Sequence, residues 1–356
     1  MRALSATERG ALAGIALATA LAGFANYGGW AAVPRFAIAT VALAGLAWVV
    51  SLATEQLGER FGPAVTGMLQ STLGNLPELF VVVFALQKGQ LVVAQTAIVG
   101  SMLANAMLVL GLVIVVGARR EPDGVMRFSK RLPRDTTTLL LLTVFIIVLL
   151  ALSLGSHDPA SHHVKAISAV GAVCLLGVYA AWAIDYLRSD KAPGAGTEEQ
   201  QRKPRLSLPA TLTLLGVAGV ASAFVSDWFI AALQPAIDQL GLSQAFAGLV
   251  IVAIAGNAVE NTAGIVLAAK GKADLAISVV KNSVAQIAAF LFPALVLISF
   301  ALSTTLTFSL APVYTGALGL SALALWQVSG DGRAAEFEGW ALVSMYLILA
   351  TLTLYE

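Results

Sequence analysis

Long apolar runs, separated by short polar breaks, follow one another along this chain and limit its possible folds more than any other feature. Of its 356 residues, 58% are hydrophobic and 12% are charged, whereas about 25% of the residues of a typical soluble domain are charged. Because a run of about 20 apolar residues is the length of a helix that crosses a bilayer, the pattern predicts an all-α polytopic membrane protein. Its predicted environment is the lipid bilayer, and nothing in the composition indicates binding to nucleic acid.

We expect eleven transmembrane helices. They cover approximately residues 10–30, 34–54, 61–87, 91–117, 135–154, 164–187, 207–233, 246–269, 274–300, 305–328 and 337–355. Between the sixth and seventh lies the most polar segment, whose composition cannot form a buried core. The predicted organisation is an N-terminal transmembrane helix in residues 1–33, a first five-helix repeat in 34–187, a flexible cytoplasmic linker in 188–206 and a second five-helix repeat in 207–356.

The distribution of Lys and Arg predicts the orientation. With the N-terminus in the cytoplasm, the eleven helices place all but four of the 21 Lys and Arg residues on the cytoplasmic side. The exceptions are Arg35, Lys88 and Lys165 in outer segments and Lys281 within a helix. Since cytoplasmic loops carry an excess of these residues, we predict a multi-pass protein of a bacterial plasma (inner) membrane, with the N-terminus inside and the C-terminus outside.

A Gly-Asn-x-x-Glu pattern occurs twice inside the apolar runs, ending at Glu78 and at Glu260. A carboxylate is costly to bury in a membrane, where it usually marks an ion or substrate pathway. Asn75 and Asn257 precede the two Glu residues by three positions, so that on a helix each amide shares a face with its carboxylate. These two copies are the predicted centre of a cation site.

The two copies differ in what can interrupt their helices. Pro77 removes a backbone hydrogen bond and clashes with the preceding turn, so we expect a kink or break in the third predicted helix. The carbonyl groups freed near Asn75 are further candidate ligands. The second copy has no proline, and a break there depends on Gly256 alone.

An internal repeat relates the two copies, which are 182 residues apart. Each copy lies on the second helix of a five-helix set, and because five is an odd number, the two sets are expected to cross the membrane in opposite directions. Inverted repeats with binding sites near the bilayer midplane are a recurring plan of secondary transporters. At this spacing Gly74, Asn75, Glu78, Lys88, Gly89, Ala94 and Ser101 match Gly256, Asn257, Glu260, Lys270, Gly271, Ala276 and Ser283.

The helices that follow each copy carry more side-chain oxygens: Ser101 and Asn105 after the first copy, and Asn282, Ser283 and Gln286 after the second. Two carboxylates and several neutral oxygens are typical of a site for a hard cation such as calcium, which takes about six to eight oxygen ligands. The competing interpretation is that these polar residues only hold helices together. We disfavour it for the two Glu residues, because amides would do the same at lower cost.

His and Cys residues give no indication of a zinc or copper site, and we predict no cofactor. His157, His162 and His163 fall in the loop between the fifth and sixth predicted helices, where a surface location explains them. Cys174 is the single cysteine, which excludes a disulfide framework and a thiolate metal cluster.

The paired carboxylates also suggest a mechanism of exchange. Two carboxylates facing a low-dielectric cavity repel each other and are hard to ionise together. Protons or a divalent cation can neutralise them, and because both compete for the same oxygens, one displaces the other. This competition yields antiport without a further coupling device, and one or two sodium ions can take the place of the protons.

Three charged residues near the motifs have no single interpretation. Glu55 and Asp227 lie near helix ends, where they form either an approach funnel for cations or solvated helix termini. Lys281 is a cation beside the predicted cation site. It can snorkel to the interface, pair with a Glu or stand in for a bound ion, and the sequence leaves these alternatives open.

At these motifs the sequence resembles the calcium/cation antiporter superfamily, and most closely its cation/proton exchanger branch. In that superfamily each of two repeats carries a Gly-Asn-x-x-Glu motif, followed one helix later by a Gly-Ser or Ser-rich motif. The resemblance covers about residues 50–120 and 215–300. The matching motifs are Gly74-Asn75-Leu76-Pro77-Glu78, Gly100-Ser101-Met102-Leu103-Ala104-Asn105, Gly256-Asn257-Ala258-Val259-Glu260 and Asn282-Ser283-Val284-Ala285-Gln286.

The resemblance implies ten core helices plus one N-terminal helix, Glu78 and Glu260 as cation ligands, and export of cytosolic calcium against protons. Three positions depart from the proton-exchanger pattern: Asn261 stands in place of His, Leu76-Pro77-Glu78 is closer to the sodium/calcium exchanger form, and Asn282 replaces Gly. The candidate cation ligands are Asn75, Glu78, Ser101, Asn105, Asn257, Glu260, Asn261, Asn282, Ser283 and Gln286.

The sequence therefore predicts a secondary active antiporter, not an enzyme, that exports calcium in exchange for protons by alternating access, with both ions as substrates. The first alternative is a sodium-coupled calcium exchanger, or an exchanger of another cation such as sodium, potassium or manganese. A cation channel with the Glu pair as a selectivity ring is an alternative from a different class, although inverted halves with one central pair argue against a pore. An intramembrane enzyme ranks last, because no acid/base pair accompanies a nucleophile or metal ligands at catalytic spacing.

Overall fold

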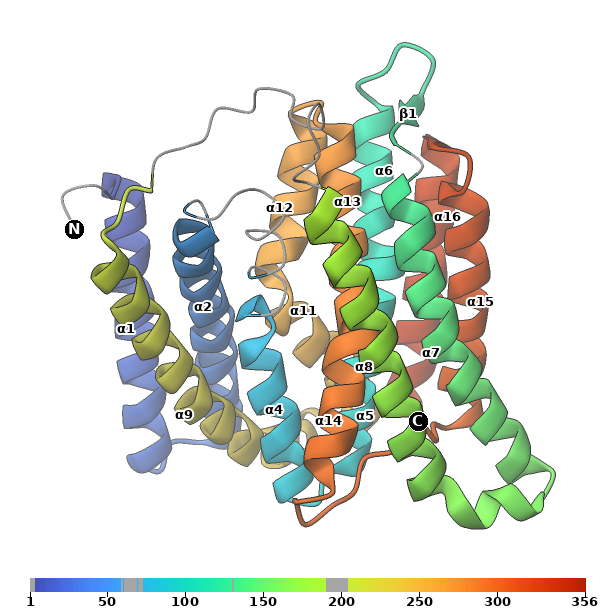
Figure 1. Ribbon diagram of the computed structural model, residues 1–356. Helices are drawn as coiled ribbons and strands as arrows, with labels where there is room; N and C mark the ends of the chain where they lie inside the picture. The colour runs from blue at the N-terminus through green and yellow to red at the C-terminus, as the bar shows by residue number, and fades with distance from the viewer. Residues whose placement is uncertain (1–3, 59, 61–68, 70–72, 130, 190–203) are drawn as a thin grey trace. The chain divides into compact units, whose positions relative to one another are not determined.

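The computed structural model describes residues 4–58, 60, 69, 73–129, 131–189 and 204–356 (Figure 1). The side chains of residues 131–134, 186, 189, 259 and 260 are outside this description as well. Most of the predicted linker and the first part of the third predicted helix therefore lie outside the described residues.

The described chain is almost entirely helical, with one short pair of strands (Figure 1). Its elements are α1 Ala6–Tyr27, α2 Ala32–Gly58, α4 Leu76–Gln87, α5 Leu91–Leu103, η1 Ala104–Val109, α6 Leu110–Ala118, β1 Val125–Arg127, α7 Arg131–Gly155, η2 Pro159–His163, α8 Val164–Ser189, α9 Leu208–Leu240, α10 Gln244–Phe246, η3 Ala247–Val252, α11 Ala253–Gly256, α12 Ala258–Ala269, α13 Ala273–Gln286, η4 Ile287–Leu291, α14 Phe292–Ser299, α15 Pro312–Ser329, β2 Arg333–Ala335 and α16 Glu336–Leu354. The elements η1, η3 and η4 are π-helical, and η2 is a 3₁₀ helix.

Helices lie in each of the eleven predicted runs. Within the described residues, eight helical segments are long and apolar enough to cross a membrane, and the bent pair Gln244–Gly256 and Asn261–Ala269 can form a ninth. The helix α4 is apolar but shorter. The prediction of a mostly helical, multi-pass membrane protein is confirmed, while the count of eleven crossings stays a prediction.

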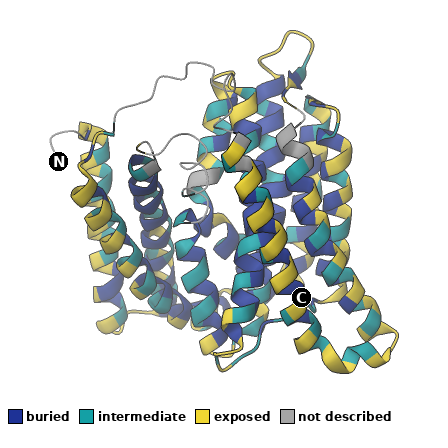
Figure 2. Ribbon diagram, in the orientation of Figure 1, coloured by how far each residue is buried: buried dark blue, intermediate teal, exposed yellow. Residues whose placement is uncertain are grey.

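The helices differ sharply in how much of their surface other helices cover. Only 17% of the apolar window of α1 and 22% of that of α9 are buried, against 89% for α5–η1–α6 and 72% for α13–η4–α14. On the exposed faces lie large apolar side chains such as Leu17 and Leu152, and the resulting mixture of burial is visible in Figure 2. Exposed apolar side chains suit contact with lipid. The two segments that carry the Ser and Asn motifs are instead largely buried, so they are interior segments.

Two compact units make up the chain. The first contains residues 1–84, 180–242 and 255–259, and the second contains residues 85–179, 243–254 and 260–356. Each unit thus takes helices from both predicted repeats.

In the first unit, α1, α2 and α9 pack together through small residues and aromatic rings. A Cβ at Gly23 would lie 2.8 Å from the Trp228 ring, and a Cβ at Gly45 would lie 2.8 Å from Ile15. The rings of Phe36 and Phe229 have centroids 5.0 Å apart. Close approach at small residues is how helices associate without a hydrophobic driving force.

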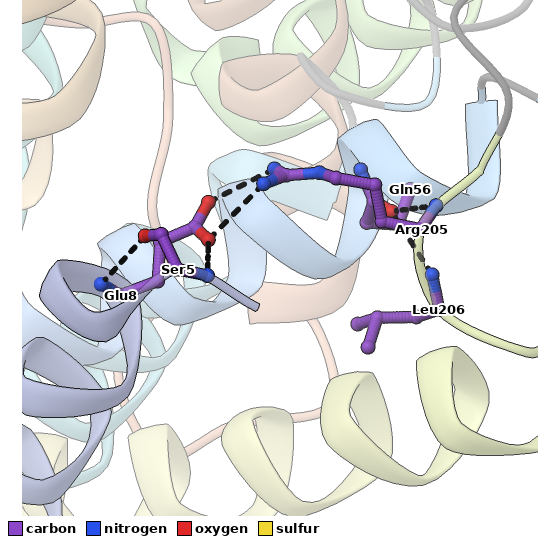
Figure 3. A network of polar contacts seen from close by, with 5 residues as sticks. All are labelled: Ser5, Glu8, Gln56, Arg205 and Leu206. Carbon is purple, nitrogen blue, oxygen red and sulfur yellow. Dashed lines mark hydrogen bonds and ion pairs between the residues drawn. The ribbon is translucent and has the colours of Figure 1, made fainter. Parts of the chain in front are cut away.

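A polar network ties the ends of these three helices together (Figure 3). The buried Gln56 side chain of α2 accepts hydrogen bonds from the backbone N–H groups of Arg205 and Leu206, at 2.7 and 3.2 Å. The Arg205 guanidinium pairs with Glu8 at 2.9 Å, and Glu8 closes a capping box with Ser5 at the start of α1. The network anchors the residues that lead into α9.

In the second unit, α5 crosses the η3 segment at very short range. A Cβ at Gly100 would lie 2.4 Å from the Leu249 carbonyl oxygen, and one at Gly248 would lie 2.0 Å from the Thr96 hydroxyl. Both positions therefore require glycine. Tyr346 also contacts this crossing, because its hydroxyl donates a hydrogen bond to the Leu249 carbonyl at 3.2 Å.

The 182-residue spacing recurs in the boundaries of the elements. Adding 182 to the bounds of α4 gives those of α12, and the starts of α5 and α13 are related in the same way. The π-helix η1 begins at Ala104 and η4 at Ile287, one residue from the expected position. Gly89 and Gly271, which precede α5 and α13, both have φ of +74°. The repeat is thus a repeat of local structure as well as of motifs.

Hydrogen bonds within the second unit give the direction of these segments. The Ser303 hydroxyl, which follows α14, donates to the Leu86 carbonyl ahead of α5 at 3.1 Å. The Arg120 guanidinium, which follows α6, donates to the Ala269 carbonyl ahead of α13. The end of each segment therefore meets the start of the other, so α5–η1–α6 and α13–η4–α14 run in opposite directions.

Charged side chains gather at the end of the second unit where β1 pairs antiparallel with β2. Arg119 forms a 2.7 Å ion pair with Glu336 and lies over the Trp340 ring. The Arg127 guanidinium holds the pKa of Asp123 below its usual range by hydrogen bonding. This end also carries Arg120, Lys270, Lys272, Asp331 and Arg333.

Candidate cation-binding site

The first Gly-Asn-x-x-Glu motif lies at an interruption in the helix. The chain is helical at Leu73 and Gly74, forms a turn at Asn75, and starts again as α4 at Leu76. The break predicted from Pro77 is therefore present, two residues before the proline. Because Glu78 falls in the first turn of α4, its carboxylate is favoured by the exposed N–H groups of the helix start.

Glu78 is 1% exposed and Asn75 is 5% exposed, so both predicted ligands of the first motif are buried. The Asn75 carbonyl accepts the Leu79 N–H at 2.9 Å. The Pro77 carbonyl next to Glu78 accepts a long hydrogen bond, of 3.5 Å, from the Ser226 hydroxyl of α9. Burial of a carboxylate at a helix break is costly, and such a residue inside a membrane protein usually marks an ion or substrate pathway.

The second motif is interrupted at the equivalent position. The helix α11 ends at Gly256, Asn257 forms a turn, and α12 begins at Ala258. The helices on either side, 244–256 and 261–269, are bent by 58°. Here the chain breaks without a proline, which the sequence pattern did not establish.

Part of the second motif lies beside the first motif in the first unit. A Cβ built on Gly256 would lie 3.7 Å from the Glu78 Cβ, and Asn257, the next residue, is fully buried. The backbone of the second motif therefore adjoins the Glu78 side chain.

Glu260 is the other carboxylate predicted as a ligand. Its backbone belongs to the first turn of α12, but its side chain is outside the described residues. Its role as a ligand stays a prediction.

Ser101 and Asn105 lie in the interior of the second unit, and both are fully buried. The Asn105 amide nitrogen donates to the Ser101 carbonyl at 3.0 Å, which leaves the amide oxygen turned the other way. Asn105 belongs to the π-helix η1, and single π-helical turns inside α-helices are frequent at functional sites.

The second repeat supplies four more oxygens. Within the described part of the chain, the side-chain oxygens of Asn261, Asn282, Ser283 and Gln286 are buried and have no hydrogen-bond partner. A buried polar atom without a partner costs about 1–3 kcal/mol, and a cation removes this cost by coordination. All four residues were predicted as cation ligands from the sequence.

Lys281 is 2% exposed, and its ammonium donates a hydrogen bond to the Ser329 hydroxyl of α15. The side chain does not reach solvent, which rules out snorkelling, one of the three alternatives that the sequence left open. Pairing with a Glu and replacement of a bound ion remain.

Two further polar residues line the same interior region. Thr136 and Thr137 of α7 border a small cavity together with Asn105 and Lys281. Neither was among the residues predicted from the sequence. The available signal was a run of three Thr residues at the start of the fifth predicted helix, where hydroxyl groups also serve merely to bond their own helix.

The three histidines predicted to lie on a surface loop are remote from these polar residues in the sequence. His157, His162 and His163 are exposed on and beside η2. Among the described residues no group of three or more His, Cys, Asp and Glu side chains is close enough to hold a metal ion. The ligands predicted from the sequence are instead carboxylate, amide and hydroxyl oxygens.

Comparison with known proteins gives matches over almost the whole chain. The profile of the sodium/calcium exchanger protein family matches residues 32–184 and 210–355. The vacuolar calcium ion transporter of Schizosaccharomyces pombe is 30% identical over 333 residues, covering 92% of this chain and 80% of that protein. The Ca²⁺/H⁺ antiporter of Synechocystis sp. is 29% identical over 346 residues and covers 92% of both chains.

Solved structures agree with these sequence matches. Native YfkE has a TM-score of 0.80 with 26% identity, covering 96% of this chain and 98% of that one. The H⁺/Ca²⁺ exchanger CAX has a TM-score of 0.74 over 98% of this chain and 93% of that one. At 15% identity, the second likeness establishes the shared fold alone.

Proposed function

This chain belongs to the sodium/calcium exchanger protein family, in the cation/proton exchanger branch of the calcium/cation antiporter superfamily, and we propose that it exports calcium in exchange for protons. The observation that carries the proposal is the buried carboxylate of Glu78 at a helix break, against the glycine of the second motif. Relatives named as Ca²⁺/H⁺ antiporters, matched over nine-tenths of their length, support the choice of ions.

We propose an architecture of eleven transmembrane helices, with one N-terminal helix ahead of two inverted five-helix repeats in residues 34–187 and 207–356. The recurrence of element boundaries at 182 residues supports the repeat. The opposite course of α5–η1–α6 and α13–η4–α14 supports the inversion. Inverted repeats permit alternating access, because the two halves can exchange conformations.

The proposed ligands of calcium are the two Glu residues and the neutral oxygens of the four motifs. Calcium takes about six to eight oxygens, and the buried acceptors of Asn261, Ser283 and Gln286 supply part of such a set. Protons on the Glu residues replace calcium in the other half of the cycle. Because Asn261 cannot titrate, unlike the His that proton exchangers usually have, the protons are assigned to the carboxylates.

The proposed location is a bacterial plasma membrane, with the end of the second unit that contains β1 and β2 in the cytoplasm. That end carries most of the Arg and Lys residues of the unit, which agrees with the positive-inside rule. Of the described Lys and Arg side chains of the unit, the opposite end carries Lys88 and Lys165. The N-terminus is then cytoplasmic and the C-terminus external.

Calcium uptake into liposomes under an imposed proton gradient, an imposed sodium gradient or neither tests the function. We expect uptake driven by protons, and its loss in Glu78→Gln and in Glu260→Gln. The control is Glu121→Gln in an exposed loop, which should transport as the wild type does. Uptake driven by sodium would replace protons with sodium as the coupling ion, and uptake that needs no counter-ion would indicate a channel.

A further inference from the structure

A small cavity in the second unit joins Lys281 to the predicted cation ligand Asn105. Its volume is about 10 Å³, which is enough for roughly one water molecule. Thr136 and Thr137 of α7 complete its polar lining, and all four side chains are less than 8% exposed. The cavity therefore brings the lysine side chain together with amide- and hydroxyl-bearing side chains in the interior of the second unit.

The ammonium of Lys281 makes the same demands on its surroundings as a monovalent metal ion. It has three N–H donors and no acceptor, so only oxygen atoms can satisfy it. The Ser329 hydroxyl accepts one of these bonds and itself donates to the Leu325 carbonyl. The hydroxyl proton of Ser329 therefore points toward the Leu325 carbonyl, and a lone pair of the hydroxyl oxygen faces the Lys281 ammonium.

The position of this charge is not repeated in the other half. The residue 182 positions before Lys281 is Val99, although α5 and α13 match in their starts and in the glycine turns that precede them. Lys281 thus adds one positive charge to one repeat only. It does so directly beside Asn282 and Ser283, whose oxygens are buried without a hydrogen-bond partner among the described residues.

We propose that the Lys281 ammonium is a tethered cation, which fills a monovalent-cation position formed by Asn105, Ser329, Thr136 and Thr137. A calcium carrier with this lysine moves one monovalent ion fewer in each cycle than it would with the position open. The consequence for transport rests on the proposed function, whereas the filling of the position does not.

Thermal unfolding of the purified protein in choline, sodium, potassium or ammonium chloride tests the filled position. We expect Lys281→Ala to open it, so that one of the three small cations raises Tm saturably above its value in choline. The wild type should not respond. Two matched variants should not respond either. Lys281→Met fills the space without a charge, and Val280→Ala enlarges the same cavity but keeps the lysine.

An unchanged Tm of Lys281→Ala in all four salts would overturn the proposal, as would an equal response of Val280→Ala. If Lys281→Ala does not fold, Lys281→Ser, which also opens the position, is measured by the same criteria. The thermal assay measures binding of small cations and does not depend on which ion the protein transports. A negative result in this assay is therefore distinct from a failure of calcium transport.

Transport gives the second readout. In liposomes, calcium uptake by Lys281→Ala should depend on the small cation identified by the thermal assay, and the net charge moved per calcium should differ by one from that of the wild type. Wild-type uptake should be equal in that cation and in choline. If Lys281→Ala in choline moved the same charge per calcium as the wild type, this result would contradict a filled ion position.

Discussion

Ser283 and Gln286 illustrate how single side chains define the candidate site. Both are at most 3% exposed on α13, and within the described chain their oxygens have no hydrogen-bond partner. A helix-to-helix role would have left these atoms bonded, because buried polar groups are nearly always satisfied. Unsatisfied acceptors instead fit a site that is completed by its ion.

Replacement of Ser283 by alanine tests this interpretation. We expect Ser283→Ala to raise the calcium KM about tenfold, since the loss of one oxygen ligand is expected to cost about 1–2 kcal/mol of binding, with little change in Tm. The control is Ser321→Ala on α15, whose hydroxyl bonds the Ala317 carbonyl of its own helix. A lower Tm with unchanged KM in Ser283→Ala would assign the hydroxyl to packing.

Asn261 offers a test that depends on pH. Its buried oxygen is an acceptor that cannot titrate, whereas an imidazole has a reference pKa of about 6.5. In Asn261→His, a positive charge beside the site should weaken calcium binding as the pH falls below about 6.5, and binding should be restored above it. The wild type and Asn261→Gln should lack this step in a plot of calcium Kd against pH; its appearance in Asn261→Gln would refute the assignment.

At the scale of residues, the sequence predicted the motifs and the interruption near Pro77, because a carboxylate in an apolar run and a proline in a helix have direct physical costs. It did not predict the break at Asn257, since no local residue forbids a helix there. It also did not predict that Lys281 is buried beside Thr136 and Thr137. Contacts between side chains on different helices depend on how the helices are rotated, which a single sequence does not state.

At the scale of elements, close crossings hold the motif helices in place. The tightest within the described residues of the second unit joins α5 to η3 at Gly100 and Gly248. The sequence pattern contained Gly100 only as part of a Gly-Ser motif. Its structural reason is the Leu249 backbone, which leaves no room for a Cβ.

Alanine at this crossing should be strongly destabilising. A Cβ at Gly100 would lie 2.4 Å from the Leu249 carbonyl oxygen, so the helices must separate, at a cost of about 1–3 kcal/mol or more. We expect Gly100→Ala to lower Tm and to reduce transport. Gly177→Ala on α8, where no atom lies within 4 Å of the new Cβ, should leave Tm unchanged or raise it; equal losses in both variants would show that the crossing is not the cause.

At the scale of the whole molecule, orientation in the membrane is the property that the sequence predicts most indirectly. It follows from the count of helices and the distribution of Lys and Arg, and a single miscounted helix would reverse every later loop. The antiparallel course of α5–η1–α6 and α13–η4–α14 supports the same arrangement independently of charge.

Labelling of single cysteines measures the orientation. In a Cys174→Ser background, a membrane-impermeant thiol reagent should label Ser156→Cys in intact cells and Glu121→Cys only after permeabilisation. Both positions are exposed, and in the sequence Glu121 precedes α7 whereas Ser156 directly follows it. Labelling of Glu121→Cys from outside would reverse the proposed topology.

The central claim is that calcium and protons compete for the same carboxylates. Purified protein in weakly buffered detergent solution, with a pH-sensitive dye, tests it without a membrane or a gradient. The account predicts that added calcium releases protons from the wild type, and that the release is reduced in Glu78→Gln and absent in the double variant Glu78→Gln with Glu260→Gln. Calcium binding to the wild type without proton release would contradict the account.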